Sequence, residues 1–171
     1  LAGNPMTYSV MYNQVEQGYM AGYLAGLVTK SSMKGATPDL KVGAIVAQEY
    51  PALTTEMIPG YTQGFKAVDP AITLDYRVIG NWWDANKAAD LANSMMDAGV
   101  DVILSIAGGA GQGTIKAAQA RGRYIVYFDS NVYKLAPGTI IGCATLDQER
   151  AVYEVLKKAV QGKLQFGKAD V

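Results

Sequence analysis

Hydrophobic residues gather in short runs that alternate with longer, helix-like stretches along the chain. The clearest example is Val100–Ser130, in which two apolar runs, Val102–Ile106 and Tyr124–Phe128, enclose a glycine-rich turn and a stretch of small residues. The apolar runs are too short for helices, and glycines end the first of them, so each predicts a buried strand. The stretch Thr114–Ala120 between them predicts a helix. A strand, a helix and a second strand in this order form a β-α-β unit with parallel strands.

The same alternation continues on both sides of this unit. The pattern predicts further strands at Thr7–Met11, Lys41–Ala47, Thr73–Ile79 and Thr139–Cys143, and helices at Gln14–Met33, Thr54–Val68, Ala85–Ala98 and Asp147–Val160. Strands that alternate with helices indicate an α/β fold, a doubly wound parallel sheet with helices on both faces. No linker or low-complexity segment divides the chain.

Several residues predict where individual helices begin and end. Asp84 is well placed to cap the helix that starts at Ala85, and Gly99 is a typical C-terminal stop. Pro59 lies inside the apolar pattern of Thr54–Val68, where an interior proline costs about 3 kcal/mol. We therefore expect this helix to kink, or to begin near Ile58.

Glycine recurs every four residues in the first predicted helix, at Gly18, Gly22 and Gly26. One face of this helix thus carries almost no side chains. In a membrane this spacing would suggest helix dimerisation. In a soluble chain we expect the helix to press closely onto the sheet.

Composition excludes several classes of function. The chain has 171 residues, equal numbers of acidic and basic residues and a net charge of zero, which argues against a nucleic-acid partner. Histidine is absent and Cys143 is the only cysteine. The common nucleophilic triads and nearly all zinc and transition-metal sites are therefore excluded, and we expect no metal or cofactor. Cys143 lies in an apolar segment and is expected to be a small buried hydrophobe.

No stretch of the sequence is apolar over the roughly 18–20 residues that a membrane span requires. The first residues, LAGNP, lack the basic start and apolar middle of a signal peptide. Any export or lipid-anchor signal is therefore expected upstream of Leu1.

Candidate binding residues follow three of the predicted strands. They are Trp82 and Trp83, the turn with Gly108 and Gly109, and Asp129 with Ser130 and Asn131. The carboxyl ends of parallel strands meet at one edge of a sheet, where open α/β folds bind ligands. Indole rings stack on flat rings, glycine N–H groups bond polar ligand edges, and a carboxylate accepts bonds from two vicinal hydroxyls. Together they predict a site for a small polar molecule with an aromatic part, such as a nucleoside.

Other interpretations of these residues stay open. The tryptophans could cover the edge of the sheet as a hydrophobic plug, and Asn131 could simply form a turn. The glycines also resemble a dinucleotide fingerprint, with Asp129 lying 20 residues beyond Gly109. However, only Gln112 separates the second and third glycines of that fingerprint, which needs two residues there. An NAD(P)-dependent oxidoreductase is therefore an alternative.

Four ordered segments resemble the basic membrane protein family, the solute-binding lipoproteins of ABC importers that include spirochaete purine-nucleoside receptors. The segments are Gly18–Lys30, Gly60–Ile72, Gly80–Ala92 and Asp97–Ala118. The resemblance implies a type I periplasmic-binding-protein fold, in which two α/β lobes close over a ligand. The chain would correspond to the second lobe, with residues 1–13 and 144–171 as hinge segments or segments that face the other lobe.

The resemblance also implies roles for single residues. Trp82 matches an aromatic residue that stacks on the base, Gly108 and Gly109 match a glycine pair that lines the site, and Asp129 matches an aspartate that holds the ribose. The family's lysine before the last helix has no counterpart, since Leu146 occupies that position. The implied function is extracytoplasmic capture of a small solute, without catalysis, for an ABC importer permease. A ligand-sensing regulatory domain of the same fold is a further alternative.

Overall fold

The structure, a computed structural model, describes residues 4–167 and 169–170. The chain divides into two compact units, which are described separately. The larger unit is Gln14–Thr145, and the smaller combines Leu1–Asn13 with Leu146–Val171. The assignment of the smaller unit to another lobe stays a prediction.

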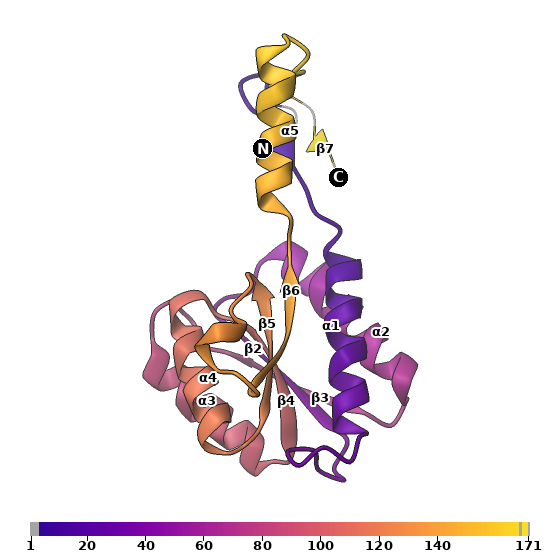
Figure 1. Cartoon of the computed structure of the whole chain (residues 1–171), viewed down its shortest axis with the longest axis vertical. Helices are drawn as coiled ribbons and strands as arrows, with labels where there is room; N and C mark the ends of the chain where they lie inside the picture. Colours follow the sequence, from indigo (N-terminus) through magenta and orange to yellow (C-terminus); the bar gives the residue numbers. More distant parts are fainter. Residues whose placement is uncertain (1–3, 168, 171) are drawn as a thin grey trace. The chain divides into compact units, whose positions relative to one another are not determined.

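The larger unit contains a five-stranded sheet in which every strand is parallel to its neighbours (Figure 1). The strand order is β3-β2-β4-β5-β6. The strands are β2 (Lys41–Val46), β3 (Thr73–Val78), β4 (Val100–Ile106), β5 (Tyr124–Asp129) and β6 (Ile140–Thr145). All seven residues of β4 are buried, as expected of a central strand that is covered on both faces.

Helices cover both faces of this sheet, so the predicted doubly wound α/β architecture is confirmed (Figure 1). One face packs against α1 (Gln14–Thr29) and α2 (Ile58–Val68). The other face packs against α3 (Ala85–Asp97) and α4 (Gly111–Ala120). Alternate side chains of one strand enter the two cores: Ile103 belongs to the α3–α4 side, and Val102 and Leu104 belong to the α1–α2 side.

The glycine-rich face of α1 packs against helix α2, so our expectation that it lies on the sheet was wrong. A Cβ atom on Gly22 would overlap the carbonyl of Tyr61, and one on Gly18 would overlap the carbonyl of Met57. In return, Gly60 and Gly64 of α2 lie against the backbone of α1. Glycines on both helices allow their backbones to approach more closely than other side chains permit. The four-residue spacing indicated the close contact but not its partner.

The segment before α2 accommodates Pro59, which an uninterrupted α-helix over Thr54–Val68 would not. A π-helical turn at Leu53–Met57 leads directly into α2, which begins at Ile58. Proline lacks the N–H that an interior helical bond needs, and a π-turn adjusts the helix at such a point. Leu53 and Met57 are both fully buried, so the turn is part of the core. The predicted irregularity near Ile58 is confirmed.

The ends of α3 follow the prediction closely. The side chain of Asp84 accepts a hydrogen bond of 2.9 Å from the N–H of Lys87, as an N-terminal cap does. After the helix, Gly99 adopts a φ of +93°, which favours glycine. Other limits differ from the prediction: α1 ends at Thr29 instead of Met33, and α4 starts at Gly111 instead of Thr114.

A buried carboxylate fastens the amino end of β4 to the chain around it. Asp101 is fully buried, and its Oδ2 accepts hydrogen bonds of 2.8 Å from the hydroxyl of Thr29 and from the N–H of Thr37. Burial raises the pKa of this carboxyl above its usual value, although these hydrogen bonds and Arg123 oppose the shift. The cluster joins the end of α1 and the loop before β2 to the central strand.

The smaller unit contains β1 (Ser9–Val10), α5 (Gln148–Val160) and β7 (Ala169–Asp170). The two short strands pair with each other in parallel, so the predicted strand Thr7–Met11 is shorter than expected and lies outside the main sheet. Asp147 caps α5 by accepting a bond from the N–H of Arg150. Among the described residues, no helix is long and apolar enough to span a membrane.

Candidate functional site

The strand order places the ends of four strands around one crevice. From β2 the chain crosses to β3 at one side and then returns to β4 on the other side of β2. In open α/β sheets such a switch point, at the carboxyl ends of the strands, is where ligands bind. A pocket of about 320 Å³ lies there, and we call it the polar pocket. Its lining residues are Tyr50, Trp82, Ser105–Gly108 and Tyr127–Ser130.

Trp82, which follows β3, is held in place by two hydrogen bonds. Its indole Nε1–H donates to Oε1 of Gln48 at 3.0 Å, and its carbonyl accepts from the N–H of Ala110 at 2.9 Å. The first bond joins the tryptophan to the segment after β2, and the second joins it to the turn after β4. About a third of the side chain, 37%, stays exposed. The indole is thus fixed before any ligand arrives.

The glycine turn after β4 contains glycines of two kinds. Gly108 has a φ of +53°, and a Cβ atom there would come within 3.2 Å of the Trp82 ring. Glycine at this position therefore allows the turn to lie against the indole ring of Trp82. Gly113 lies inside α4, where a Cβ atom would overlap the carbonyl of Ala85 at the start of α3. Only part of the glycine-rich sequence faces the pocket, and the rest allows α3 and α4 to pack closely.

Asp129 ends β5 with a φ of +77°, a conformation that few residues other than glycine adopt. Such backbone strain is concentrated at functional sites. Asp129 also influences two phenols of the polar pocket. Burial raises the pKa of Tyr50 and of Tyr127, and the charge of Asp129 raises both further. Both phenols therefore stay protonated at neutral pH and are able to donate hydrogen bonds.

The structure brings together four of the seven candidate residues predicted from the sequence and leaves three apart. Trp82, Gly108, Asp129 and Ser130 all line the polar pocket. Trp83 is 76% exposed and is not among the lining residues; nor are the exposed Gly109 and Asn131. A direct role in ligand binding stays a prediction for all seven.

Sequence reasoning missed several lining residues. Tyr50 follows β2, and Tyr127 lies inside the apolar strand β5, where we took it for a core residue. Ser105 gave a signal that could have been used, because it is the one polar residue in the run VILSIA. Gln48 was also missed, although it bonds the indole of Trp82.

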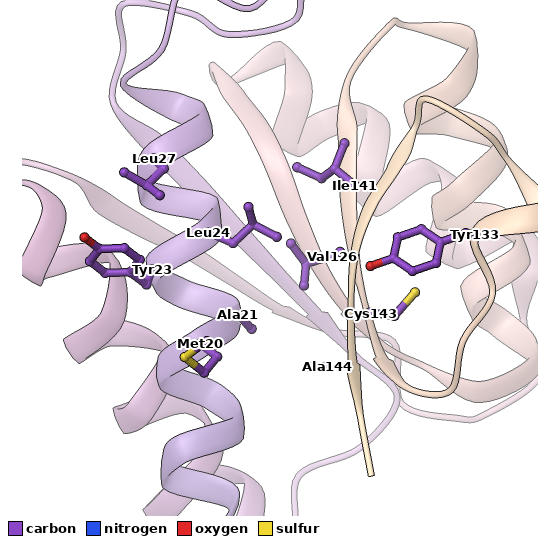
Figure 2. A pocket seen from close by; sticks show the side chains of 11 residues that line it. Met20, Ala21, Tyr23, Leu24, Leu27, Val126, Tyr133, Ile141, Cys143 and Ala144 are labelled. Atoms are coloured by element: carbon purple, nitrogen blue, oxygen red, sulfur yellow. The ribbon is translucent and has the colours of Figure 1, made fainter. Parts of the chain in front are cut away.

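A second cavity lies between α1 and the edge strand β6, and we call it the apolar groove (Figure 2). Its volume is about 380 Å³, larger than that of the polar pocket. Leu24 of α1 faces Val126 and Ile141 of the sheet across it, as Figure 2 shows. Cys143 also lines the groove; it is half-buried and packs against the core, so the expected burial of this small hydrophobe is only partial.

The polar pocket has the features of a binding site. It offers an aromatic face, a carboxylate, two phenol groups and glycine backbone. Within the part of the chain that the structure describes, no group of three or more Cys, Asp or Glu side chains could hold a metal ion. The arrangement can stack a ring and form hydrogen bonds with polar groups.

The fold is that of type I periplasmic binding proteins. A solved ABC-transporter solute-binding protein from Aeropyrum pernix K1 superposes with a TM-score of 0.82 at 23% identity, over 92% of this chain and 45% of that one. Residues 5–171 match the family model Bmp, described as ABC transporter substrate-binding protein PnrA-like. The chain therefore belongs to this family, which confirms the resemblance seen in the sequence.

Relatives with established names support the same assignment. Basic membrane protein D of Borreliella burgdorferi is 28% identical over 163 residues, which are 94% of this chain and 45% of that protein. The ABC transporter nucleoside-binding protein BmpA of Lactococcus lactis is 31% identical over 112 residues, 66% of this chain and 29% of that protein. The chain thus spans less than half the length of these relatives. They are substrate-binding proteins by name or family, which does not favour the oxidoreductase alternative.

Proposed function

We propose that this chain is one lobe of an extracytoplasmic solute-binding protein, and that its polar pocket binds a small, nucleoside-like molecule for import. The observation that carries the proposal is the gathering of Trp82, Gly108 and Asp129 around one cavity at the carboxyl ends of the strands. Its volume of about 320 Å³ is within the range of small-molecule sites. A relative named as nucleoside-binding supports this class of ligand.

In this proposal each side chain contacts a different part of the ligand. The fixed indole of Trp82 stacks on a planar base, and the carboxylate of Asp129 accepts hydrogen bonds from two neighbouring sugar hydroxyls. The phenols of Tyr50 and Tyr127 donate to ligand oxygen or nitrogen atoms. The glycine turn lets the ligand approach the backbone, where N–H groups at the start of a helix lack intrahelical partners.

Ligand capture in the whole protein proceeds by closure of two lobes. An open form admits the solute, and contacts from both lobes favour the closed form. Because Leu146 stands where the resemblance places a lysine, we propose a ligand that needs no cation at that point. Other hydroxylated or heterocyclic molecules therefore belong to the proposed class beside the common nucleosides.

The proposed partner is the permease of an ABC importer, and the proposed location is outside the cytoplasmic membrane. Attachment to the membrane would come from a lipid anchor upstream of this chain. The near-neutral pI of about 6.4 agrees with a small-molecule ligand better than with a nucleic acid.

Thermal unfolding of the complete natural protein tests the proposal. We expect adenosine, guanosine or uridine to raise the Tm, because a ligand at 100 times its Kd adds about 2.7 kcal/mol of stability. NAD and NADP serve as the comparison. A shift with these dinucleotides alone would favour the oxidoreductase alternative and overturn the proposal. Mass spectrometry of small molecules that copurify with the protein would then identify the natural ligand.

A further inference from the structure

Two buried hydroxyl groups on the α3–α4 side of the larger unit have no hydrogen-bond partner among the described residues. They are Oγ of Ser105, a residue that is 1% exposed, and Oγ1 of the fully buried Thr114. A buried hydroxyl without a partner loses its bonds to water and gains nothing in return. Buried polar groups are nearly always satisfied, so each of these exceptions requires an explanation.

The surroundings of the two hydroxyls differ. Ser105 lies one residue before the end of β4 and lines the polar pocket, and its register partner Tyr127 on β5 also lines it. A Cβ atom on Gly111 would lie 3.2 Å from Oγ of Ser105 and 3.7 Å from the phenol oxygen of Tyr127. The hydroxyls of Ser105 and Tyr127 therefore lie beside the same glycine, Gly111, at the start of α4. Thr114 lies farther along this helix and does not line the polar pocket.

We propose that Ser105 and Tyr127 form an inner polar subsite, in which both hydroxyls bind one hydrogen-bonding group of the ligand. This inference rests on the proposed function and narrows the ligand class. The ligand must carry a hydroxyl, carbonyl or amino group at the end that enters the pocket first, apart from the hydroxyls that Asp129 holds. Serine is suited to this role because its short side chain changes rotamer easily and its hydroxyl both donates and accepts.

The chemistry of the neighbouring phenol fits this subsite. Burial, the charge of Asp129 and Cys143 raise the pKa of Tyr127, so its hydroxyl keeps its proton. It therefore acts as a donor at the inner end of the pocket, while the hydroxyl of Ser105 takes whichever role remains. A ligand acceptor such as a carbonyl oxygen satisfies both hydroxyls at once.

Two matched substitutions test the subsite in the complete natural protein. S105A and T114V each remove one unpartnered buried hydroxyl, but only the first removes it from the wall of the polar pocket. Without ligand, we expect both variants to unfold at or above the wild-type Tm. With adenosine, guanosine and uridine as probes, we expect S105A to weaken the best wild-type ligand about tenfold, and T114V to leave its Kd unchanged.

The double variant sharpens the test. If Ser105 and Tyr127 bind the same ligand group, the losses in S105A and Y127F will not add, and the double variant S105A/Y127F will lose less than the product of the two. Wild-type affinity in S105A, equal weakening in S105A and T114V, or strictly multiplicative losses would overturn the subsite alone. If the wild-type protein binds none of the three nucleosides, the nucleoside part of the proposed function fails and the subsite, as tested with these probes, fails with it.

Discussion

Two cavities of the larger unit, the apolar groove and the polar pocket, differ in size and in chemistry, and the difference points away from the larger of these two. The apolar groove between α1 and β6 has a volume of about 380 Å³ and is lined almost entirely by carbon-rich side chains. The polar pocket is smaller, about 320 Å³, yet it contains a carboxylate, two phenols and an indole fixed by hydrogen bonds. A specific site for a polar solute needs directed hydrogen bonds more than it needs volume.

The largest effect is expected at Asp129. The D129N substitution removes the charge but keeps a residue that tolerates the positive φ of +77° observed there. Because hydrogen bonds to a charged group contribute about 1.5–3 kcal/mol, we expect nucleoside affinity to fall about 100-fold. Isothermal titration calorimetry measures the loss, and thermal unfolding without ligand shows whether the variant still folds. Unchanged affinity would remove Asp129 from the site.

A smaller loss is expected when the indole of Trp82 is removed. Stacking of a base on an aromatic ring contributes about 1–3 kcal/mol, so W82A should weaken binding about 10- to 100-fold. Trp83 offers a matched control in the same loop, because its side chain is 76% exposed and does not line the polar pocket. We expect W83A to bind with wild-type affinity. Equal losses in W82A and W83A would mean that binding depends on the conformation of the whole loop and not on stacking by Trp82.

Tyrosine titration tests the electrostatics of the polar pocket. Burial raises the pKa values of Tyr50 and Tyr127 above 10.0, and the charge of Asp129 raises them further, so D129N should lower both pKa values. NMR of ring-labelled tyrosine, assigned with Y50F and Y127F, measures the change.

The raised pKa values of Tyr50 and Tyr127 also favour the folded state below pH 10.0, and this contribution to stability is lost as the pH rises through the folded-state pKa values. Because both phenols stay protonated, binding of adenosine, which carries no group that titrates in this range, should be constant from pH 7 to about pH 10.

The smallest effect is expected in the apolar groove. Met20 is 70% exposed at its edge, and M20Q keeps the length of the side chain while making it polar. We expect a change in unfolding free energy of at most about 0.5 kcal/mol, no change in nucleoside affinity and no change in the titration of Tyr50 or Tyr127. A loss of nucleoside affinity in this variant would reverse the comparison between the two cavities.

The sequence predicted the fold well because the information needed for it is local. Apolar runs, the cap at Asp84 and the stop at Gly99 each depend on a few neighbouring residues, and the structure confirms the cap, the stop and the runs that form the main sheet. The partner of the glycine face of α1 is a long-range property, and there the prediction failed. Helix α2 covers this face, although nothing in the spacing of Gly18, Gly22 and Gly26 distinguishes a helix from a sheet.

The candidate site was predicted only in part, for a similar reason. Residues in loops after strands, such as Trp82 and Asp129, follow from the topology rule for α/β sheets. Ser105 and Tyr127 lie inside strands. Other residues of the same apolar runs pack in the core, and only those near the end of the strand line the pocket. Which strand residues reach the pocket depends on register and on how far each strand extends. These properties emerge only from the assembled sheet.

The hydrogen bond from the N–H of Ala110 to the carbonyl of Trp82 joins two loops that lie far apart in the sequence. It uses only main-chain atoms, so it survives any change of side chain at either position except the introduction of proline at 110. The wall that Trp82 forms and the glycine backbone are therefore one rigid part of the polar pocket. Substitutions at Tyr50 or Ser130, which also line the polar pocket, would therefore change its wall without breaking this bond.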